Sequence, residues 1–524
     1  MESPDSIVID YSEYAFKWYV ILTVATVAYF AVQQVYSRRL QRKLRATAPT
    51  VRLSDGWFGF RNLYAMVVEK RVYQMVFWLQ QQVGSVDGVG TVETWLAGNP
   101  VIITKDPENF KALFATQFDD FGLAGRYAGF KPFLGESVFT MDGPKWKHLR
   151  ALLRPQFTKE QVGHVQALEP HIQTLVALIR ETEGEPFEAM NYFMKFTQDT
   201  ATEFLFGESF FSQLDGRPGG KPDSFKQQRM RFNDSVLTAM KFSTLRVVLS
   251  KVAWLVTPRR YRDACDEIKR FTDIHVARAL AYSDDDLDQL TQHSYTILYE
   301  FAKVTKDAVV IRDQLLSMLL AGRDTTMSTL SFLWYEITRN PQVYARLRDD
   351  IAAHFGVGDD ARVDEITFES LKRCEYLKAV INETMRMWPV VPTNTREATR
   401  DTTLPRGGGV DGQSAMVVRK HQGIVISVYS THHDPAVFGP DPDSFRPERW
   451  FDPDTRKLAW AFVPFGGGPR VCLGQQFAVT EVAYVTTRLV QEFAHVANAD
   501  TKYPPDVEAH MGMVLKDKCR LRMW

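Results

Sequence analysis

The stretch FGGGPRVCLG, at residues 465–474, decides the fold of this chain. Its glycines allow the backbone to approach a neighbouring group closely, and backbone N–H groups around Cys472 can donate to a sulfur anion. Residues 475–493 are predicted to form a helix, and a helix N-terminus favours the thiolate form of a nearby cysteine. Cys472 is therefore predicted to bind a metal as a thiolate. The alternative is a Gly-rich turn with an incidental buried cysteine.

The remaining cysteines have no such context. Cys265, Cys374 and Cys519 are widely separated, and the chain's four cysteines form no C-x-x-C pair. This pattern predicts a reducing compartment, with neither a disulfide framework nor a structural zinc site. Each of the three is interpreted as a small buried hydrophobic residue.

Outward from the loop, the sequence predicts one large, mainly helical domain with small β-sheets. Residues 312–340 have the apolar character of a long central helix, and residues 342–354 read as an amphipathic helix. Residues 91–104 and 423–429 are predicted strands. No Pro/Gly/Ser-rich linker divides the chain after its first fifty residues. The formal net charge of zero argues against nucleic acid as a partner.

The N-terminal part predicts a single transmembrane helix at residues 18–37, where no charged residue occurs. About 20 residues give a helix of roughly 30 Å, which is enough to span a bilayer. The preceding residues are mainly acidic, and a basic cluster follows from Arg38 to Arg45. Because positive charge stays on the cytoplasmic side, residues 1–17 are expected to be lumenal, 38–50 a basic linker, and 51–524 cytosolic. Two alternatives are a cleaved signal peptide, which would need a basic start, and a buried core helix containing Gln33 and Gln34.

Several motifs follow one another in a recognisable order. The Cys472 loop resembles the haem-binding signature of the cytochrome P450 superfamily. WKHLR at residues 146–150 resembles the helix that reaches the haem propionates, and AGRDTT at 321–326 resembles the oxygen-activation motif. ETMR at 383–386 resembles the E-x-x-R pair, and FRPERW at 445–450 resembles its third member, with Trp450 in place of the usual phenylalanine. The resemblance covers the chain from about residue 50 to its C-terminus.

This resemblance implies the cytochrome P450 fold, preceded by the transmembrane helix, and a non-covalent haem b with the Cys472 thiolate as axial ligand. Ala321 stands where relatives that bind haem covalently carry glutamate. The residues implied to contact the haem are Cys472, Arg470, Trp146, Arg150, Arg396 and Phe465. Those implied to support the loop are Glu383, Arg386 and Arg449. An exposed ion pair is the alternative for Glu383 and Arg386, and an ordinary amphipathic face is the alternative for Trp146 and Arg150.

Asp324 and Thr325 are the catalytic candidates. Together with Gly322 they place residues of poor helix propensity inside one apolar helix, and such local violations are expected at functional sites. Cleavage of the O–O bond of dioxygen requires protons, which a carboxyl can relay and a hydroxyl-bound water can deliver. The alternative is a structural kink, because a mid-helix threonine bonds back to the preceding turn.

Within the superfamily, the chain is similar to the fungal alkane- and fatty-acid-hydroxylating group, through residues 134–161, 403–420 and 461–493. The implied reaction is hydroxylation of terminal or near-terminal C–H bonds of an apolar small molecule, with dioxygen and electrons from NADPH through NADPH–cytochrome P450 reductase. The expected location is the endoplasmic reticulum membrane, with the catalytic domain facing the cytosol. Residues 118–139 and 390–395 are the expected cavity lining. The rival functions are a tailoring monooxygenase of a secondary-metabolite pathway, a haem-thiolate isomerase or lyase, and a non-catalytic haem carrier.

Overall fold

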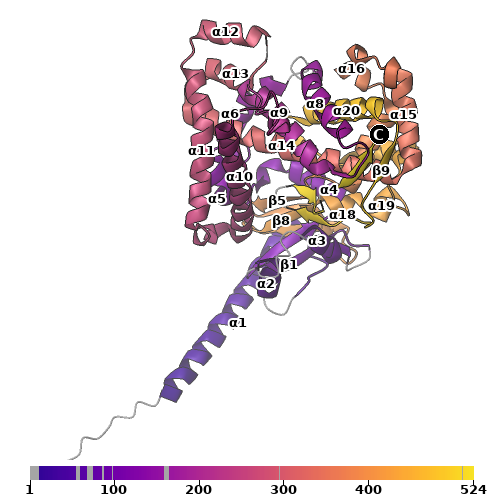
Figure 1. Ribbon diagram of the computed structural model, residues 1–524. Coiled ribbons are helices and arrows are strands. Elements are labelled where there is room, and N and C mark those ends of the chain that lie inside the picture. Colours follow the sequence, from indigo (N-terminus) through magenta and orange to yellow (C-terminus); the bar gives the residue numbers. More distant parts are fainter. Residues whose placement is uncertain are drawn as a thin grey trace, which may run out of the picture.

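The helix predicted in the middle of the chain is α14, Ala308–Arg339, and it lies at the centre of the body (Figure 1). It begins at Asp307, whose carboxylate accepts the backbone N–H groups of Val309 and Val310. The computed structural model describes residues 11–524 except 55–58, 68–74, 85–87, 97, 158–164, 294, 510–511 and 518. Around α14 pack α9 (Ala189–Phe206), α11 (Arg259–Leu280), α17 (Glu375–Met387) and α20 (Gln475–Glu492).

Two large hydrophobic clusters meet along α14. One joins its C-terminal half to α8 (Glu169–Arg180), α15 (Pro341–Phe355), α17 and α20. The other joins its N-terminal half to α5 (Arg126–Leu134), α10 (Asp223–Leu249) and α11. Further helices among the described residues are α2 (Phe60–Val67), α3 (Met75–Gly84), α4 (Pro107–Lys111), α6 (Gly143–Leu153), α12 (Asp284–His293), α13 (Ile297–Val304), α16 (Phe368–Leu371), α18 (Val428–His432) and α19 (Pro435–Phe438). The helices predicted at 342–354 and 475–493 correspond to α15 and α20.

The sheets are small, as predicted. The largest has the order β1 (Thr91–Leu96), β2 (Asn99–Thr104), β8 (Gly423–Ser427), β5 (Thr393–Ala398) and β3 (Phe121–Gly122). Its pairs are antiparallel except β2 with β8, which is parallel from Val101↔Gly423 to Thr104↔Ile426. The other sheets are β6 (Thr402–Gly408) with β7 (Ser414–Val418), β10 (Val507–Ala509) with β11 (Met513–Leu515), and β4 (Phe187–Glu188) with β12 (Arg520–Met523) and β9 (Val496–Asn498).

The N-terminal helix α1, Tyr11–Leu44, projects from the body (Figure 1). It contains the span predicted at 18–37 and continues into the stretch predicted as a basic linker, while residues 1–10 of the predicted lumenal tail lie outside the described residues. Two hydrogen bonds tie its C-terminal half to the body: Tyr36 Oη donates to Asp401 at 2.5 Å, and Arg419 Nη1 donates to Gln33 Oε1 at 3.1 Å. In the described part of the chain, no helix has both the length and the hydropathy required to cross a membrane.

Candidate active site around Cys472

The Cys472 loop is a tight turn whose ends meet: the backbone N–H of Cys472 donates to the carbonyl of Phe465 at 3.1 Å. Gly468 has a φ of +63°, and a Cβ at this position would lie 1.8 Å from the carbonyl oxygen of Phe114. Glycine is therefore required here both for the backbone conformation and for the close approach. The loop presents its cysteine immediately before α20 begins at Gln475.

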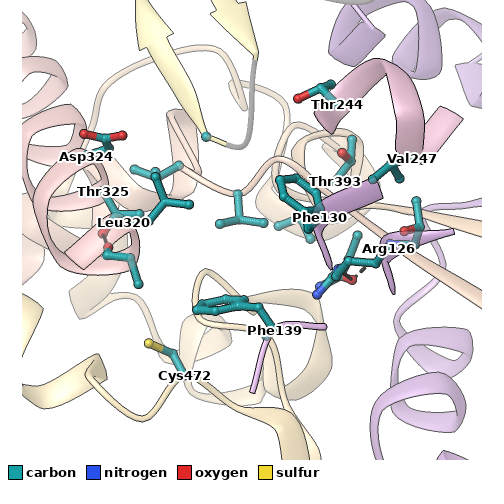
Figure 2. A pocket seen from close by; sticks show the side chains of 18 of the residues that line it. Arg126, Phe130, Phe139, Thr244, Val247, Leu320, Asp324, Thr325, Thr393 and Cys472 are labelled. Atoms are coloured by element: carbon teal, nitrogen blue, oxygen red, sulfur yellow. Dashed lines mark hydrogen bonds between the residues drawn. The ribbon is translucent and has the colours of Figure 1, made fainter. Parts of the chain in front are cut away.

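The Cys472 side chain faces a cavity and is exposed there (Figure 2). Burial raises the pKa of this thiol above its usual value, whereas the backbone N–H of Gly474 and the guanidinium of Arg150 lower it. The sulfur thus has a donor and a nearby cation, but a thiolate here still needs a further positive charge. A metal ion supplies that charge.

The cavity above Cys472 has a volume of about 1430 Å³. Leu320 and Thr325 of α14 line one side, and Phe130 of α5 and Val247 of α10 line the opposite side (Figure 2). Phe139 lies near the cysteine. The lining expected from the sequence at 118–139 and 390–395 contributes residues from both segments. The space suits an apolar molecule much larger than water.

Trp146, Arg150 and Arg470 meet beside the Cys472 loop. Arg150 Nη2 donates to the carbonyl of Val471 at 2.8 Å, and the Arg470 guanidinium lies 4.1 Å from the centre of the Trp146 ring. Arg470 also donates to Asp142 at 2.5 Å. Burial lowers the pKa of Arg470 to about 10; Asp142 opposes this shift, and neighbouring arginines reinforce it.

Arg396 of β5 adds a further cation, and so does Arg126, which sequence reasoning did not single out. Both guanidinium groups donate to Asn394 Oδ1, at 2.7 Å and 3.2 Å respectively. Burial lowers the pKa of Arg396 to about 9, and Arg126 and Arg470 lower it further by repulsion. We call Arg126, Arg150, Arg396 and Arg470 the arginine cluster. Asp142 supplies one negative charge beside Arg470, and four like charges held this close favour a further anion among them.

On α14, the Thr325 hydroxyl donates to the carbonyl of Ala321 at 2.5 Å, which is the back-bonding expected of a mid-helix threonine. The Asp324 carboxylate accepts from Arg323 Nε at 2.6 Å. Arg323 is buried and also donates to Asn233 Oδ1 of α10 at 3.1 Å. An acid and a hydroxyl therefore lie together at the cavity wall, and the acid is connected to the helix on the opposite side.

Glu383 and Arg386 are fully buried and are not an exposed ion pair. Arg386 donates through Nε and Nη2 to the Glu383 carboxylate at 2.9 Å and 2.8 Å, and Arg449 Nε lies 3.4 Å from it. Trp450 Nε1 donates to the same carboxylate at 3.0 Å, a bond that the usual phenylalanine could not make. Arg386 Nη1 donates to the carbonyl of His432 at 2.9 Å. The network joins α17 to residues 432–450, the segment that leads to the Cys472 loop.

Glu481 of α20 is a second residue that sequence reasoning missed. It lines the cavity, is buried, and accepts from Thr200 Oγ1 at 2.9 Å. Burial raises the pKa of Glu481 to about 7. The available signal was a glutamate on the apolar face of the helix that follows the cysteine loop.

A cysteine at the base of an apolar cavity, with a cluster of buried cations beside it, matches the needs of one group: a haem with a metal to take the thiolate and propionates to pair with the arginines. The fold and the site thus define a haem-thiolate protein. The comparisons agree. The family model "Cytochrome P450" matches residues 54–521, and the chain belongs to this family.

Two curated relatives match almost end to end. Cytochrome P450 52A12 of Debaryomyces hansenii is 46% identical over 508 residues, covering 97% of this chain and 98% of the relative. Cytochrome P450 52A5 of Candida maltosa is 45% identical over 515 residues, covering 98% of each. Among solved structures, the haem domain of cytochrome P450DA superimposes with a TM-score of 0.69 at 21% identity, covering 86% of this chain and 91% of that one. The predicted superfamily, its fungal group and the mainly helical fold are confirmed. The chain is a haem-thiolate monooxygenase.

Proposed function

We propose that this cytochrome P450 hydroxylates terminal or near-terminal C–H bonds of fatty acids or n-alkanes, with dioxygen and electrons from NADPH. The observation that carries the proposal is the apolar lining of the cavity beside Cys472, which includes Phe130, Phe139 and Leu320. The volume of about 1430 Å³ holds the haem and the substrate together, and the apolar lining suits a long hydrocarbon chain. Terminal attack requires a restricted approach, because methylene C–H bonds are weaker than methyl ones and would otherwise react first. The Phe139 ring near Cys472 and Leu320 of α14 are placed to provide that restriction (Figure 2).

When bound, the haem supplies the iron at which dioxygen is reduced and the substrate carbon is oxidised. Cys472 would hold the haem iron through its sulfur, and Trp146, Arg150, Arg396 and Arg470 would contact its propionates, with no covalent link to the chain. The mutual repulsion within the arginine cluster supports this assignment. Phe465 closes the loop through its carbonyl. Glu383, Arg386 and Arg449 hold the segment that leads to it.

Asp324 and Thr325 are assigned to proton delivery. Because the Thr325 hydroxyl donates its proton to Ala321, its oxygen lone pairs are directed elsewhere and can accept from a water in the cavity. Asp324 is partly exposed and can exchange protons with solvent. Arg323 donates to the Asp324 carboxylate and fixes its orientation.

We further propose that residues 18–37 anchor the chain in the endoplasmic reticulum membrane, with 1–17 lumenal, 38–50 a basic connection and 51–524 cytosolic. Trp18, Ile21 and Val24 of α1 are exposed, which is the arrangement expected of a helix that contacts lipid. A membrane location brings the protein to apolar substrates dissolved in the bilayer. The electron donor would be NADPH–cytochrome P450 reductase.

The test is co-expression with the reductase and incubation of membranes with NADPH and a panel of fatty acids and n-alkanes. Products are identified by mass spectrometry, with Cys472→Ala as the inactive control. Terminally hydroxylated products that disappear in the control support the proposal. A protein that binds haem and carbon monoxide but leaves the whole panel unchanged contradicts the substrate class and directs the search to secondary metabolites.

A further inference from the structure

A second group of metal-ligating side chains lies outside the haem site, between α15 and α17. Asp350 and His354 are one turn apart on α15 and so share one face of the helix. Cys374 immediately precedes α17. One ligand atom from each residue, a carboxylate oxygen, a ring nitrogen and the sulfur, lies within 4.8 Å of the others. We propose that these three residues bind a zinc ion or another thiophilic divalent cation, with water as a fourth ligand.

The Asp350 carboxylate is already oriented for this role. Its Oδ2 accepts the backbone N–H of Leu377, in the first turn of α17, at 3.2 Å. Cys374 makes no side-chain capping bond of its own, so Asp350 caps α17 from the neighbouring helix. This bond leaves Oδ1, which lies 3.6 Å from His354 Nδ1, for the cation. Hydrogen bonds that fix a ligand from behind are a regular feature of metal sites.

The His354 ring is held against its own helix, because Nδ1 donates to the carbonyl oxygen of Asp350 at 2.8 Å, and this leaves Nε2 as the ring nitrogen for the cation. The side chain remains 34% exposed, so the cation and its water can reach the site from solvent. Cys374, in contrast, is fully buried. The site thus combines a buried sulfur ligand with a partly exposed histidine. In zinc sites with three protein ligands, water takes the fourth position, and it can enter here beside the histidine.

Binding of a divalent cation here would take the Cys374 sulfur as thiolate, release one proton to solvent and neutralise the Asp350 carboxylate. The N-terminus of α17, a helix of 13 residues, adds a partial positive charge that favours the thiolate.

The position gives the cation a structural consequence. Cys374 and Leu377 belong to the start of α17, and Glu383 and Arg386 lie further along the same helix. A cation bridging α15 and α17 would hold in place the helix that supports the Cys472 loop. None of the three ligands lines the haem cavity, so the proposal does not depend on the substrate.

The test uses the untagged holoprotein, stripped with a chelator and titrated with zinc against a dye of known zinc affinity, with elemental analysis after dialysis. We expect one tightly bound equivalent in the wild type. Cys374→Ser and His354→Gln should each weaken binding by about tenfold or more. The matched controls are Cys265→Ser, another buried cysteine, and Asp349→Asn, the exposed carboxylate beside Asp350. Both should bind zinc as the wild type does.

A second measurement is the thermal unfolding midpoint, which zinc should raise in the wild type and both controls but not in the two ligand variants. If Cys374→Ser does not fold, His354→Gln decides the question, because its side chain is partly exposed. Failure of the wild type to retain zinc at micromolar concentrations would overturn the proposal. Equal affinity in the ligand variants and the controls would also overturn it, because the zinc would then be bound elsewhere.

Discussion

Replacing Glu383 by glutamine is expected to lower the free energy of unfolding by about 3–5 kcal/mol, the usual effect of removing one partner from a buried ion pair. Its carboxylate has no exposed surface and accepts from Arg386, Arg449, Trp450 and the backbone N–H of Arg446. Glutamine keeps the shape but removes the charge, and it presents N–H groups to buried guanidinium groups that can only donate. This loss is a large part of the roughly 5–15 kcal/mol that stabilises a typical domain.

The measurement is urea unfolding followed by tryptophan fluorescence, together with the carbon monoxide difference spectrum for intact thiolate-bound haem. The matched control is Glu365→Gln, because Glu365 and Arg362 have the same i,i+3 spacing but Glu365 is 58% exposed. That control should change the free energy of unfolding by less than about 0.5 kcal/mol. A loss below about 1 kcal/mol in Glu383→Gln, or an equal loss in both variants, would refute the reasoning that burial makes this pair essential.

Three further predictions concern the cavity and the core. Thr325→Ala should lower product formation about 100-fold and increase the peroxide released per NADPH consumed, whereas Thr325→Ser, which keeps the hydroxyl, should restore product formed per NADPH. An equal product yield per NADPH in both variants would contradict the proton-delivery role. Arg126→Gln should increase the rate of haem transfer to apomyoglobin about tenfold, because about 1.4 kcal/mol of charge-assisted hydrogen bonding to the haem is lost. An unchanged rate would mean that Arg126 does not contact the haem. Burial raises the pKa of Glu336 from 4.5 to about 7. The folded state therefore keeps its full stability at pH values below the pKa of this carboxyl in the unfolded chain. Stability is lost as the pH rises through the pKa of the carboxyl in the folded protein, because the buried side chain must then ionise. The free energy of unfolding of Glu336→Gln, measured with urea, should equal that of the wild type near about pH 5 and exceed it by about 1–3 kcal/mol near about pH 8. The glutamine oxygen can still accept the bond from Trp388. Equal free energies of unfolding at both pH values would contradict this prediction.

The helices were predictable because their signals are local. The amphipathic pattern at 342–354 placed α15 to within one residue at each end. The strand predicted at 91–104 is instead a hairpin, β1 and β2. Its turn contains Gly98 at a φ of +79°, and the Gly98-Asn99 pair was a readable turn signal.

Residues of the site could be predicted from the sequence where they belong to motifs of fixed spacing. The cysteine loop and the E-x-x-R pair have fixed spacings, so Cys472, Glu383 and Arg386 could be named from the sequence. Arg126 has no such signal, because its partner Asn394 lies 268 positions away in sequence. The same limit applies to Cys374, interpreted from the sequence as a plain hydrophobic residue, since its neighbours on α15 become visible only in three dimensions.

His432 is fully buried beside the ion-pair network. Its Nε2 accepts the backbone N–H of Val463 at 3.3 Å, shortly before the Cys472 loop, and its carbonyl accepts from Arg386. Burial lowers the pKa of His432 to about 3, so the ring is neutral and can accept this bond. The histidine thus connects the ion-pair network to the loop, a role that no local pattern indicated.

The arginine cluster also bears on how the chain reaches its folded state. Arg150 bonds to the carbonyl of Val471, 321 positions further along the chain, so the haem site closes only when distant segments have met. Contacts of such long range form late in folding and slowly. A haem held among these segments binds the finished structure and not the unfolded chain, so mass action draws the folding equilibrium toward completion. Haem supply during synthesis is therefore expected to set the yield of folded protein. The haem content per chain then measures the fraction of molecules in which these distant segments have come together.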